Sequence, residues 1–296
     1  MYSWPHIIKQ IIILIYINNK SFLLNIFLIV RRENMITMII SSCDKFSDLW
    51  YEHIRLLKEH WKGTLCRILL VTDKNTTQYF SDVEIIVAPS NFDFPKRIKY
   101  ALDFVDTEYV LVTLDDYFLT NDVFYSNIYK LENIAKKKQI DYLLLYNRRK
   151  TNEKKYKPVG TLEKINLDKN YSVNLYPALW KKDFLIKTVK DNSTPWEYEF
   201  SLTKTAILEN ANCYFSPSGA FDILDVVRKG KILHKAKKYF VKNNIIIENR
   251  ETISYLIEIK LWLMDRVSWY APKKIQLLLK RILNKFGMKF FSDNQI

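Results

Sequence analysis

The sequence contains little glycine and few cysteines for its length. Only five glycines occur among 296 residues, and no Walker A loop, GxSxG or HExxH motif is present. P-loop NTPase, serine hydrolase and zincin chemistry therefore lack their signatures. The three cysteines, Cys43, Cys66 and Cys213, are far apart and form no CxxC pair. They indicate neither a disulfide framework nor a zinc site, and they fit a reducing compartment.

The N-terminal residues 1–34 are apolar but lack a run long enough to cross a bilayer. The unbroken run from Ile11 to Ile17 ends at a polar stretch, well short of the roughly 20 residues that a transmembrane helix needs. Charged residues follow where a signal peptide has small ones. Because Met35 directly precedes the first strand pattern, we expect residues 1–34 to be an extension, with an over-extended translation start as one explanation and a membrane-inserted hairpin as the alternative.

Charge is unevenly distributed along the chain. Hydrophobic residues make up 48% and aromatic residues 15%, which predicts a packed globular protein. From Arg228 to the end there are 16 Lys/Arg against 5 Asp/Glu, so this quarter carries +11 of the net +14. The rest of the chain is nearly balanced. We therefore expect no nucleic-acid partner, and the basic C-terminal region instead favours an anionic membrane surface.

From residue 36 to about residue 147, short apolar runs alternate with helical patterns. Strand patterns lie at 36–41, 67–72, 84–88, 109–114 and 142–146, and helical patterns at 47–61, 95–105 and 122–136. This alternation predicts an α/β fold with a mostly parallel twisted sheet and helices on both faces. The lysine-rich stretch 147–170 predicts a long surface loop.

The pair Asp115-Asp116 ends the most apolar strand pattern, YVLVTL. Ligands of open parallel sheets bind beyond the carboxyl ends of the strands. Two carboxylates there can bind Mg²⁺ or Mn²⁺ at a nucleotide diphosphate, or one can accept a hydrogen bond from a ribose hydroxyl. A solvated turn that caps the next helix is the alternative, and the spacing alone does not decide between the two.

The stretch YVLVTLDDYFL, with PKRIKYALDFV before it and SSCDKFSDLWYEHIRLLKEHW near the start, resembles the GT-A glycosyltransferases of bacterial surface-polysaccharide clusters. The resemblance covers about residues 35–235 and is most specific at LDDYFL and PWEYE. It implies a GT-A-like fold, a nucleotide-sugar donor, a glycan or lipid-linked glycan acceptor, and inverting transfer assisted by Mg²⁺ or Mn²⁺. The acid pair departs from the family's Asp-x-Asp, which puts metal dependence in question.

The same resemblance implies roles for further residues near the strand ends. Asp115 and Asp116 hold the donor diphosphate and the metal. Asp44 and Asp73 match positions that hold the base or ribose, with a helix cap and a turn residue as alternatives. Arg97 matches an arginine that meets a phosphate, with an ordinary surface arginine as the alternative.

The PWEYEF motif supplies the candidate general base. A carboxylate beside aromatic residues has a raised pKa, which suits a general base. The resemblance implies that Glu199 is this base, since it matches the family's more regular acid, and Glu197 is the alternate. An acid-rich helix N-terminus is the alternative interpretation. Trp196 and Trp180 are expected to contact the acceptor, with a place in the core as the alternative for Trp180. By the same resemblance, His234 is expected to be a metal ligand supplied from the C-terminal region of the chain.

The C-terminal region, 226–296, predicts basic amphipathic helices that follow a catalytic domain at 35–225. Between residues 271 and 291 apolar residues recur at helical spacing among lysines and arginines, with no acidic residue. This pattern predicts an interfacial helix that docks on the inner, cytoplasmic face of the cell membrane and brings the site to a lipid-linked acceptor.

Two other classes of protein remain as alternatives. A sugar-phosphate nucleotidyltransferase uses a similar sheet and acid pair, but it usually carries a glycine-rich phosphate loop near the first strand, where this sequence reads SSCDKFSD. A non-catalytic membrane-surface binding protein needs only the C-terminal region. It leaves the Asp pair and the Trp-Glu-Tyr-Glu cluster unexplained.

Overall fold

The computed structural model describes residues 36–146, 158–190, 193–247 and 250–270, with side chains up to residue 263. The chain divides into two compact units, Met1–Leu224 and Asp225–Ile296. The first unit contains the central sheet. The N-terminal extension and the amphipathic segment 271–291 lie outside the described residues.

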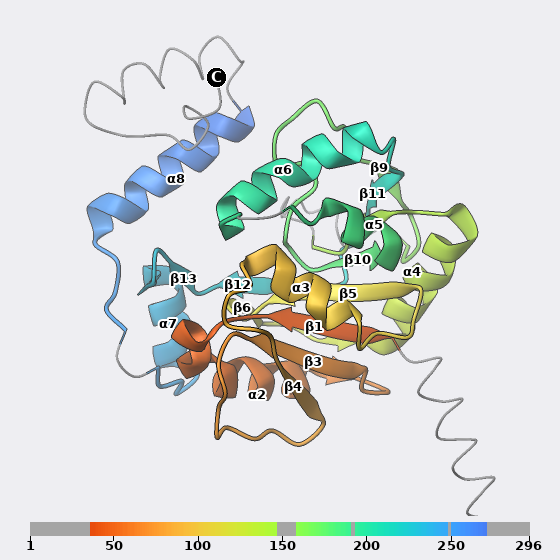
Figure 1. Cartoon of the computed structure of the whole chain (residues 1–296). Coiled ribbons are helices and arrows are strands. Elements are labelled where there is room, and N and C mark those ends of the chain that lie inside the picture. Colours follow the sequence, from red (N-terminus) through yellow and green to blue (C-terminus); the bar gives the residue numbers. More distant parts are fainter. Residues whose placement is uncertain (1–35, 147–157, 191–192, 248–249, 271–296) are drawn as a thin grey trace, which may run out of the picture. The chain divides into compact units, whose positions relative to one another are not determined.

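An eight-stranded sheet forms the centre of the first unit (Figure 1), with strand order β4-β3-β1-β5-β10-β8-β11-β9. Six strands run in one direction, and only β10 and β9 run against their neighbours. The bounds are β1 (Thr37–Ser41), β3 (Arg67–Thr72), β4 (Val83–Val87), β5 (Tyr109–Leu114), β8 (Tyr142–Leu144), β9 (Glu163–Lys164), β10 (Ala178–Lys181) and β11 (Cys213–Phe215). The predicted mostly parallel α/β sheet is confirmed.

Alternating strand residues feed two apolar cores, one on each face of the sheet. Met38 and Ile40 of β1 belong to the core under α2 (Trp50–His60) and α4 (Tyr125–Lys138). Ile39, beside Leu69 and Val112 in register, belongs to the core under the helices of the other face. These helices are α3 (Phe94–Leu102), α5 (Lys182–Thr188) and α6 (Pro195–Leu208). Burial on both faces explains why the central strands are continuous apolar runs.

Local signals in the sequence set where α3 and α6 begin. Asp93 accepts a hydrogen bond from the backbone N–H of Lys96 at 3.0 Å, and Pro95 occupies the first turn of α3. Thr194 and Glu197 form a reciprocal capping box at the start of α6. Both arrangements satisfy backbone N–H groups that have no partner within the helix. The predicted start of a helix at Pro95 is confirmed.

Shorter elements depart from the sequence-based expectations. The helix expected from residue 122 begins at Tyr125, because β7 (Val123–Phe124) pairs with β2 (Trp61–Lys62). The expected loop 147–170 contains β9, which pairs with β11 at the sheet edge, and its residues 147–157 lie outside the described part of the chain. Directly after the acid pair, β6 (Tyr117–Leu119) pairs with β12 (Ile223–Asp225).

In the second unit, the described residues up to 270 form a short hairpin and two helices. Strands β13 (Val227–Arg228) and β14 (Lys231–Ile232) meet at Lys229 and Gly230, which both have positive φ, as a type I′ hairpin turn requires. Helices α7 (His234–Lys242) and α8 (Tyr255–Tyr270) follow. Within the described ranges, none of the helices is long and apolar enough to cross a membrane.

Candidate functional site

The acid pair lies at the carboxyl edge of the sheet, where the order of strands reverses. The chain runs from β1 outward to β3 and β4 and returns to β5 on the other side of β1. Ser42 comes directly after β1, and Asp115 comes directly after the adjacent strand β5. The Ser42 hydroxyl donates a hydrogen bond to the Asp115 carboxylate. The indole Nε1–H of Trp50 donates to the Ser42 hydroxyl at 2.7 Å. A switch point of this kind is where open α/β sheets bind their ligands.

Asp44, Asp73 and Arg97 are brought together at the same edge. The backbone N–H of Asp44 donates to the Asp73 carboxylate at 2.7 Å, and the Arg97 guanidinium lies 4.0 Å from the same carboxylate. Lys74 forms an ion pair with Asp44 at 2.9 Å. The Arg97 side chain is only 12% exposed and also donates to the backbone carbonyl of Phe92. Asp73 therefore organises a compact polar cluster rather than an isolated turn.

Cys43 is close enough to both Asp115 and Asp73 for their charges to act on its thiol. Burial, Asp115 and Asp73 raise the pKa of its thiol, and Arg97 partly opposes them. The thiol therefore stays protonated near neutral pH. Cys43 and Ser42 were not predicted as site residues, although both lie in the SSCD segment directly after the first strand.

The two members of the acid pair differ in their surroundings. Asp115 is 6% exposed, whereas Asp116 is half-buried. Beneath them, burial lowers the pKa of His53 to about 4, partly offset by the backbone of Asp115. The His53 ring packs edge-on against Phe118, with 5.9 Å between ring centroids. A neutral imidazole thus supports the strand end, and Asp116 is the more exposed residue of the pair, although its Oδ1 atom is buried.

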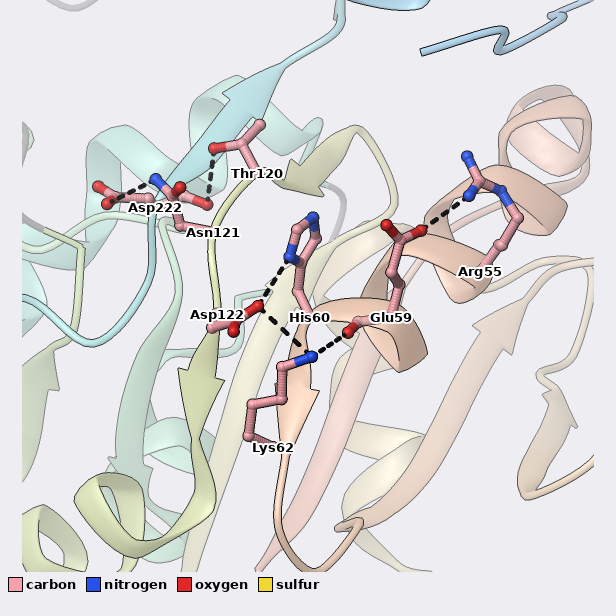
Figure 2. A network of polar contacts seen from close by, with 8 residues as sticks. All are labelled: Arg55, Glu59, His60, Lys62, Thr120, Asn121, Asp122 and Asp222. Carbon is pink, nitrogen blue, oxygen red and sulfur yellow. Dashed lines mark hydrogen bonds and ion pairs between the residues drawn. The ribbon is translucent and has the colours of Figure 1, made fainter.

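Polar contacts also fix the turn that follows β6 (Figure 2). Asp122 forms a hydrogen bond with the ring Nδ1 of His60 at 3.1 Å and an ion pair with Lys62 at 3.6 Å, and the hydrogen bond with His60 lowers the pKa of Asp122. On the other side of the turn, Asn121 donates to the Asp222 carboxylate at 3.1 Å. Exposed contacts of this kind contribute little to stability, because solvent screens the charges. Their effect is to hold the chain after the acid pair between the end of α2 and the start of β12.

The two candidate bases of α6 have different surroundings. The Glu197 carboxylate accepts a hydrogen bond from the backbone N–H of Thr194 at 2.8 Å, which lowers its pKa. The expectation that aromatic neighbours raise the pKa is therefore wrong for Glu197, because helix capping dominates. Glu199 is half-buried and accepts a hydrogen bond from the backbone N–H of Leu175 at 3.3 Å. Of the two, Glu199 stays the candidate base.

The two tryptophans expected at the acceptor occupy different places. Trp180 is fully buried in β10, where its ring lies 4.5 Å from Tyr142 and 6.0 Å from Phe184, centroid to centroid. Its expected acceptor contact is therefore wrong, because no part of the ring reaches the surface. Trp196 is 58% exposed at the start of α6 and stays a candidate.

His234 belongs to the second unit, at the start of α7. Its ring Nδ1 contacts the Glu258 carboxylate, and its ring stacks on Tyr255 with 3.5 Å between centroids. The part of the chain that the structure describes contains no group of three or more His, Cys, Asp or Glu side chains arranged to hold a metal ion. Asp115 and Asp116 offer hard oxygen ligands at the sheet edge, as do the neighbouring carboxylates of Asp44 and Asp73.

Comparisons with known proteins give structural similarity alone. No protein-family profile matches the sequence, and no curated protein matches it. Similar solved structures include residues 1–349 of TarS from S. aureus in complex with UDP-GlcNAc, at 16% identity and TM-score 0.44, covering 67% of this chain and 60% of that chain. Another is the mannosyltransferase PcManGT from Pyrobaculum calidifontis in complex with GDP-Man and Mn²⁺, at 13% identity and TM-score 0.45, covering 66% and 58%.

A third similar structure, TarS 1–349 in complex with UDP, has 15% identity and TM-score 0.45 and covers 63% of this chain and 59% of that chain. The chain thus spans less than two thirds of the length of these proteins. Similarity at this level carries no conclusion about activity.

Proposed function

We propose that the chain is a glycosyltransferase of the GT-A type that takes a sugar from a nucleotide-sugar donor. The observation that carries the proposal is the hydrogen bond from Ser42 to Asp115 across the switch point of the sheet. Together with the influence of both Asp115 and Asp73 on the Cys43 thiol, it supports a site that combines the acid pair with Asp44, Asp73 and Arg97 at the carboxyl edge of the sheet, where an open α/β sheet binds a nucleotide. The resemblance of LDDYFL and PWEYE to this family supports the same function.

Each group at the edge has a role in this proposal. Asp44 and Asp73 accept hydrogen bonds from the nucleoside, and Arg97 binds a phosphate. The half-buried Asp116 faces the donor diphosphate, and the buried Asp115 holds the strand end that carries Asp116. Mg²⁺ is commonly held by one or two carboxylates together with substrate phosphates, so this acid pair fits Mg²⁺ or Mn²⁺, which would supply positive charge to the leaving diphosphate.

Glu199 acts as the general base in an inverting transfer. Its carboxylate takes the proton of the acceptor hydroxyl while the hydroxyl oxygen forms a bond to the anomeric carbon. The bond between that carbon and the diphosphate oxygen breaks, and the nucleoside diphosphate leaves with the electron pair. Single displacement on the face opposite the leaving group inverts the anomeric configuration.

The test is a thermal-shift measurement on the full chain with UDP-, GDP-, CMP- and dTDP-sugars, each with and without Mn²⁺. A ligand that binds the native state raises the melting temperature. We expect a shift with one nucleotide class that Asp116→Asn removes and that the exposed control Asp168→Asn keeps. The absence of a shift with every donor would contradict the proposed function and favour the membrane-binding alternative.

We further propose that the enzyme works in bacterial surface-polysaccharide synthesis, peripherally on the inner face of the cell membrane, with a lipid-linked glycan as acceptor. The second unit supports this. Helix α7 carries four exposed lysines and no acid: Lys235, Lys237, Lys238 and Lys242. Helix α8 exposes Leu256 (82%), Ile259 (53%) and Leu263 (50%). Exposed lysines on one helix of this unit and exposed apolar side chains on the other fit an anionic lipid surface.

Vesicle flotation tests the membrane proposal. The full chain is expected to float with vesicles that contain phosphatidylglycerol and to stay behind with pure phosphatidylcholine. Replacing the four α7 lysines by glutamine should weaken flotation, while the same number of lysines replaced at Lys96, Lys99, Lys130 and Lys169 of the first unit should not. Equal flotation with both vesicle types would contradict the electrostatic part of the proposal.

A further inference from the structure

Three tyrosines form an aromatic stack at the carboxyl edge of the sheet, next to the acid pair. Tyr117 directly follows Asp116, Tyr146 follows β8, and Tyr176 precedes β10, which runs in the opposite direction. The rings of Tyr117 and Tyr176 are stacked, with 5.2 Å between centroids and 23° between planes. The Tyr146 ring lies 4.8 Å from the Tyr176 ring at 40°.

The stack leads from the acid pair to the candidate base. Tyr176 is preceded by Leu175, whose backbone N–H donates to Glu199 Oε1 at 3.3 Å. A continuous series of bonded neighbours and contacts therefore runs from Asp116 through Tyr117 and Tyr176 to Glu199. The anomeric carbon of a donor must lie between its leaving diphosphate and the base that activates the acceptor.

We infer that Tyr176 and Tyr146 form the wall against which the hexose ring of the nucleotide-sugar packs. The inference rests on the proposed function, because that function places the diphosphate at Asp116 and the base at Glu199. Tyr117 is only 9% exposed, whereas Tyr146 and Tyr176 are half-buried and keep part of their surface open.

The chemistry of the wall matches a sugar ring. The C–H face of a pyranose is slightly positive and apolar, and it complements the negative face of an aromatic ring. The hydroxyls of the sugar need polar partners, and small-molecule sites combine apolar walls with a few such groups. Asp116 precedes Tyr117 in the chain, and Glu199 contacts the backbone of Leu175 beside Tyr176, so both carboxylates come from the surroundings of the stack.

The test separates binding of the hexose from binding of the nucleotide. Calorimetric titration of the full chain compares UDP with UDP-glucose, GDP with GDP-mannose, and dTDP with dTDP-glucose. With the nucleotide that binds, Tyr176→Leu should weaken affinity for the sugar ester by about five- to tenfold, the range of one aromatic contact, and leave the free diphosphate unchanged. Tyr176→Phe keeps the ring and should bind as the native chain does.

A second aromatic pair provides the matched control. Tyr125 and Tyr129 of α4 are stacked with 6.2 Å between centroids, and Tyr129 is 47% exposed. Tyr129→Leu should leave both affinities unchanged. If Tyr176→Leu does not fold, Tyr146→Leu replaces it in the same comparison.

The outcomes separate the inference from the function beneath it. Equal weakening of the diphosphate and its sugar ester by Tyr176→Leu would overturn the hexose wall and leave the donor site standing. Unchanged affinity for both would overturn the wall as well. If the native chain binds none of the six compounds, the hexose wall is overturned, whereas the proposed function is decided by the thermal-shift screen, which also contains CMP-sugars.

Discussion

Ser42 donates its hydroxyl hydrogen to the carboxylate of Asp115, although the two residues are 73 positions apart in the chain. The bond joins the ends of two adjacent parallel strands, β1 and β5, and Trp50 donates to the same hydroxyl from α2. Three elements thus converge on one side chain beside the acid pair. The relationship makes Ser42 a positioning residue whose loss should be felt in both stability and binding.

Replacing Ser42 by alanine should destabilise the protein by about 1–3 kcal/mol, because a buried carboxylate and a buried indole N–H each lose a hydrogen-bond partner. Urea denaturation measures the change. Ser41→Ala is the matched control, since the buried Ser41 hydroxyl has no hydrogen-bond partner among the described residues. The prediction is contradicted if both variants lose the same stability, or if Ser42→Ala binds nucleotide-sugar as tightly as the native chain does.

Stability should fall with acidification because of His53. Its folded-state pKa of about 4 lies below the ordinary value of 6.5, because burial disfavours the charged ring. Between these pH values the unfolded chain binds a proton that the folded chain does not, so the free energy of unfolding decreases as pH falls from 6.5 towards 4. The shift corresponds to about 3 kcal/mol.

Comparison with His53→Leu isolates this contribution from that of the carboxylates. The difference in unfolding free energy between the native chain and the variant should change across that pH window and stay constant above it. Urea denaturation at a series of pH values provides the measurement. Parallel curves for the two proteins would show that His53 is not the titrating group.

The same substitution to glutamine should lower turnover strongly at Glu199 and change it little at Glu197. Glu199→Gln removes the proposed base and should lower turnover by about 10²–10⁴-fold without loss of donor binding. Glu197→Gln keeps a capping side chain at the start of α6 and should change both activity and melting temperature little. Turnover and melting temperature are measured for both variants. An inactive Glu197→Gln together with an active Glu199→Gln would mean that Glu197, and not Glu199, is the general base.

The main strands could be predicted from the sequence because their physical cause is local. YVLVTL has one polar residue and RILLVT is apolar at its four central positions, as burial between two helical layers requires, and β5 and β3 have the predicted bounds. The short strand β9 could not be predicted, since two residues, Glu163 and Lys164, carry no periodicity and their pairing depends on β11.

The candidate site was only partly predictable. Asp44, Asp73 and Arg97 follow strands or open a helix, so topology alone brings them together. The contact of Ser42 with Asp115 depends on which strands are neighbours, and no local pattern encodes that. The role of Glu197 did have a signal, because Thr-Pro-Trp-Glu matches the spacing of a capping box.

The two tryptophans offer the last prediction. Trp180 lies in the core between Tyr142 and Phe184, so Trp180→Ala should cost about 3–5 kcal/mol of stability, the usual cost of removing a large buried side chain. Trp196 is 58% exposed, and Trp196→Ala should stay within about 0.5 kcal/mol of the native chain. If Trp196 contacts the acceptor, its replacement raises the KM for acceptor and leaves the donor affinity unchanged. Denaturation curves measure the stability of both variants, and kinetics with varied acceptor together with donor titrations test the acceptor contact of Trp196. A strongly destabilised Trp196→Ala would mean that the Trp196 ring packs against the protein and is not free to contact a ligand.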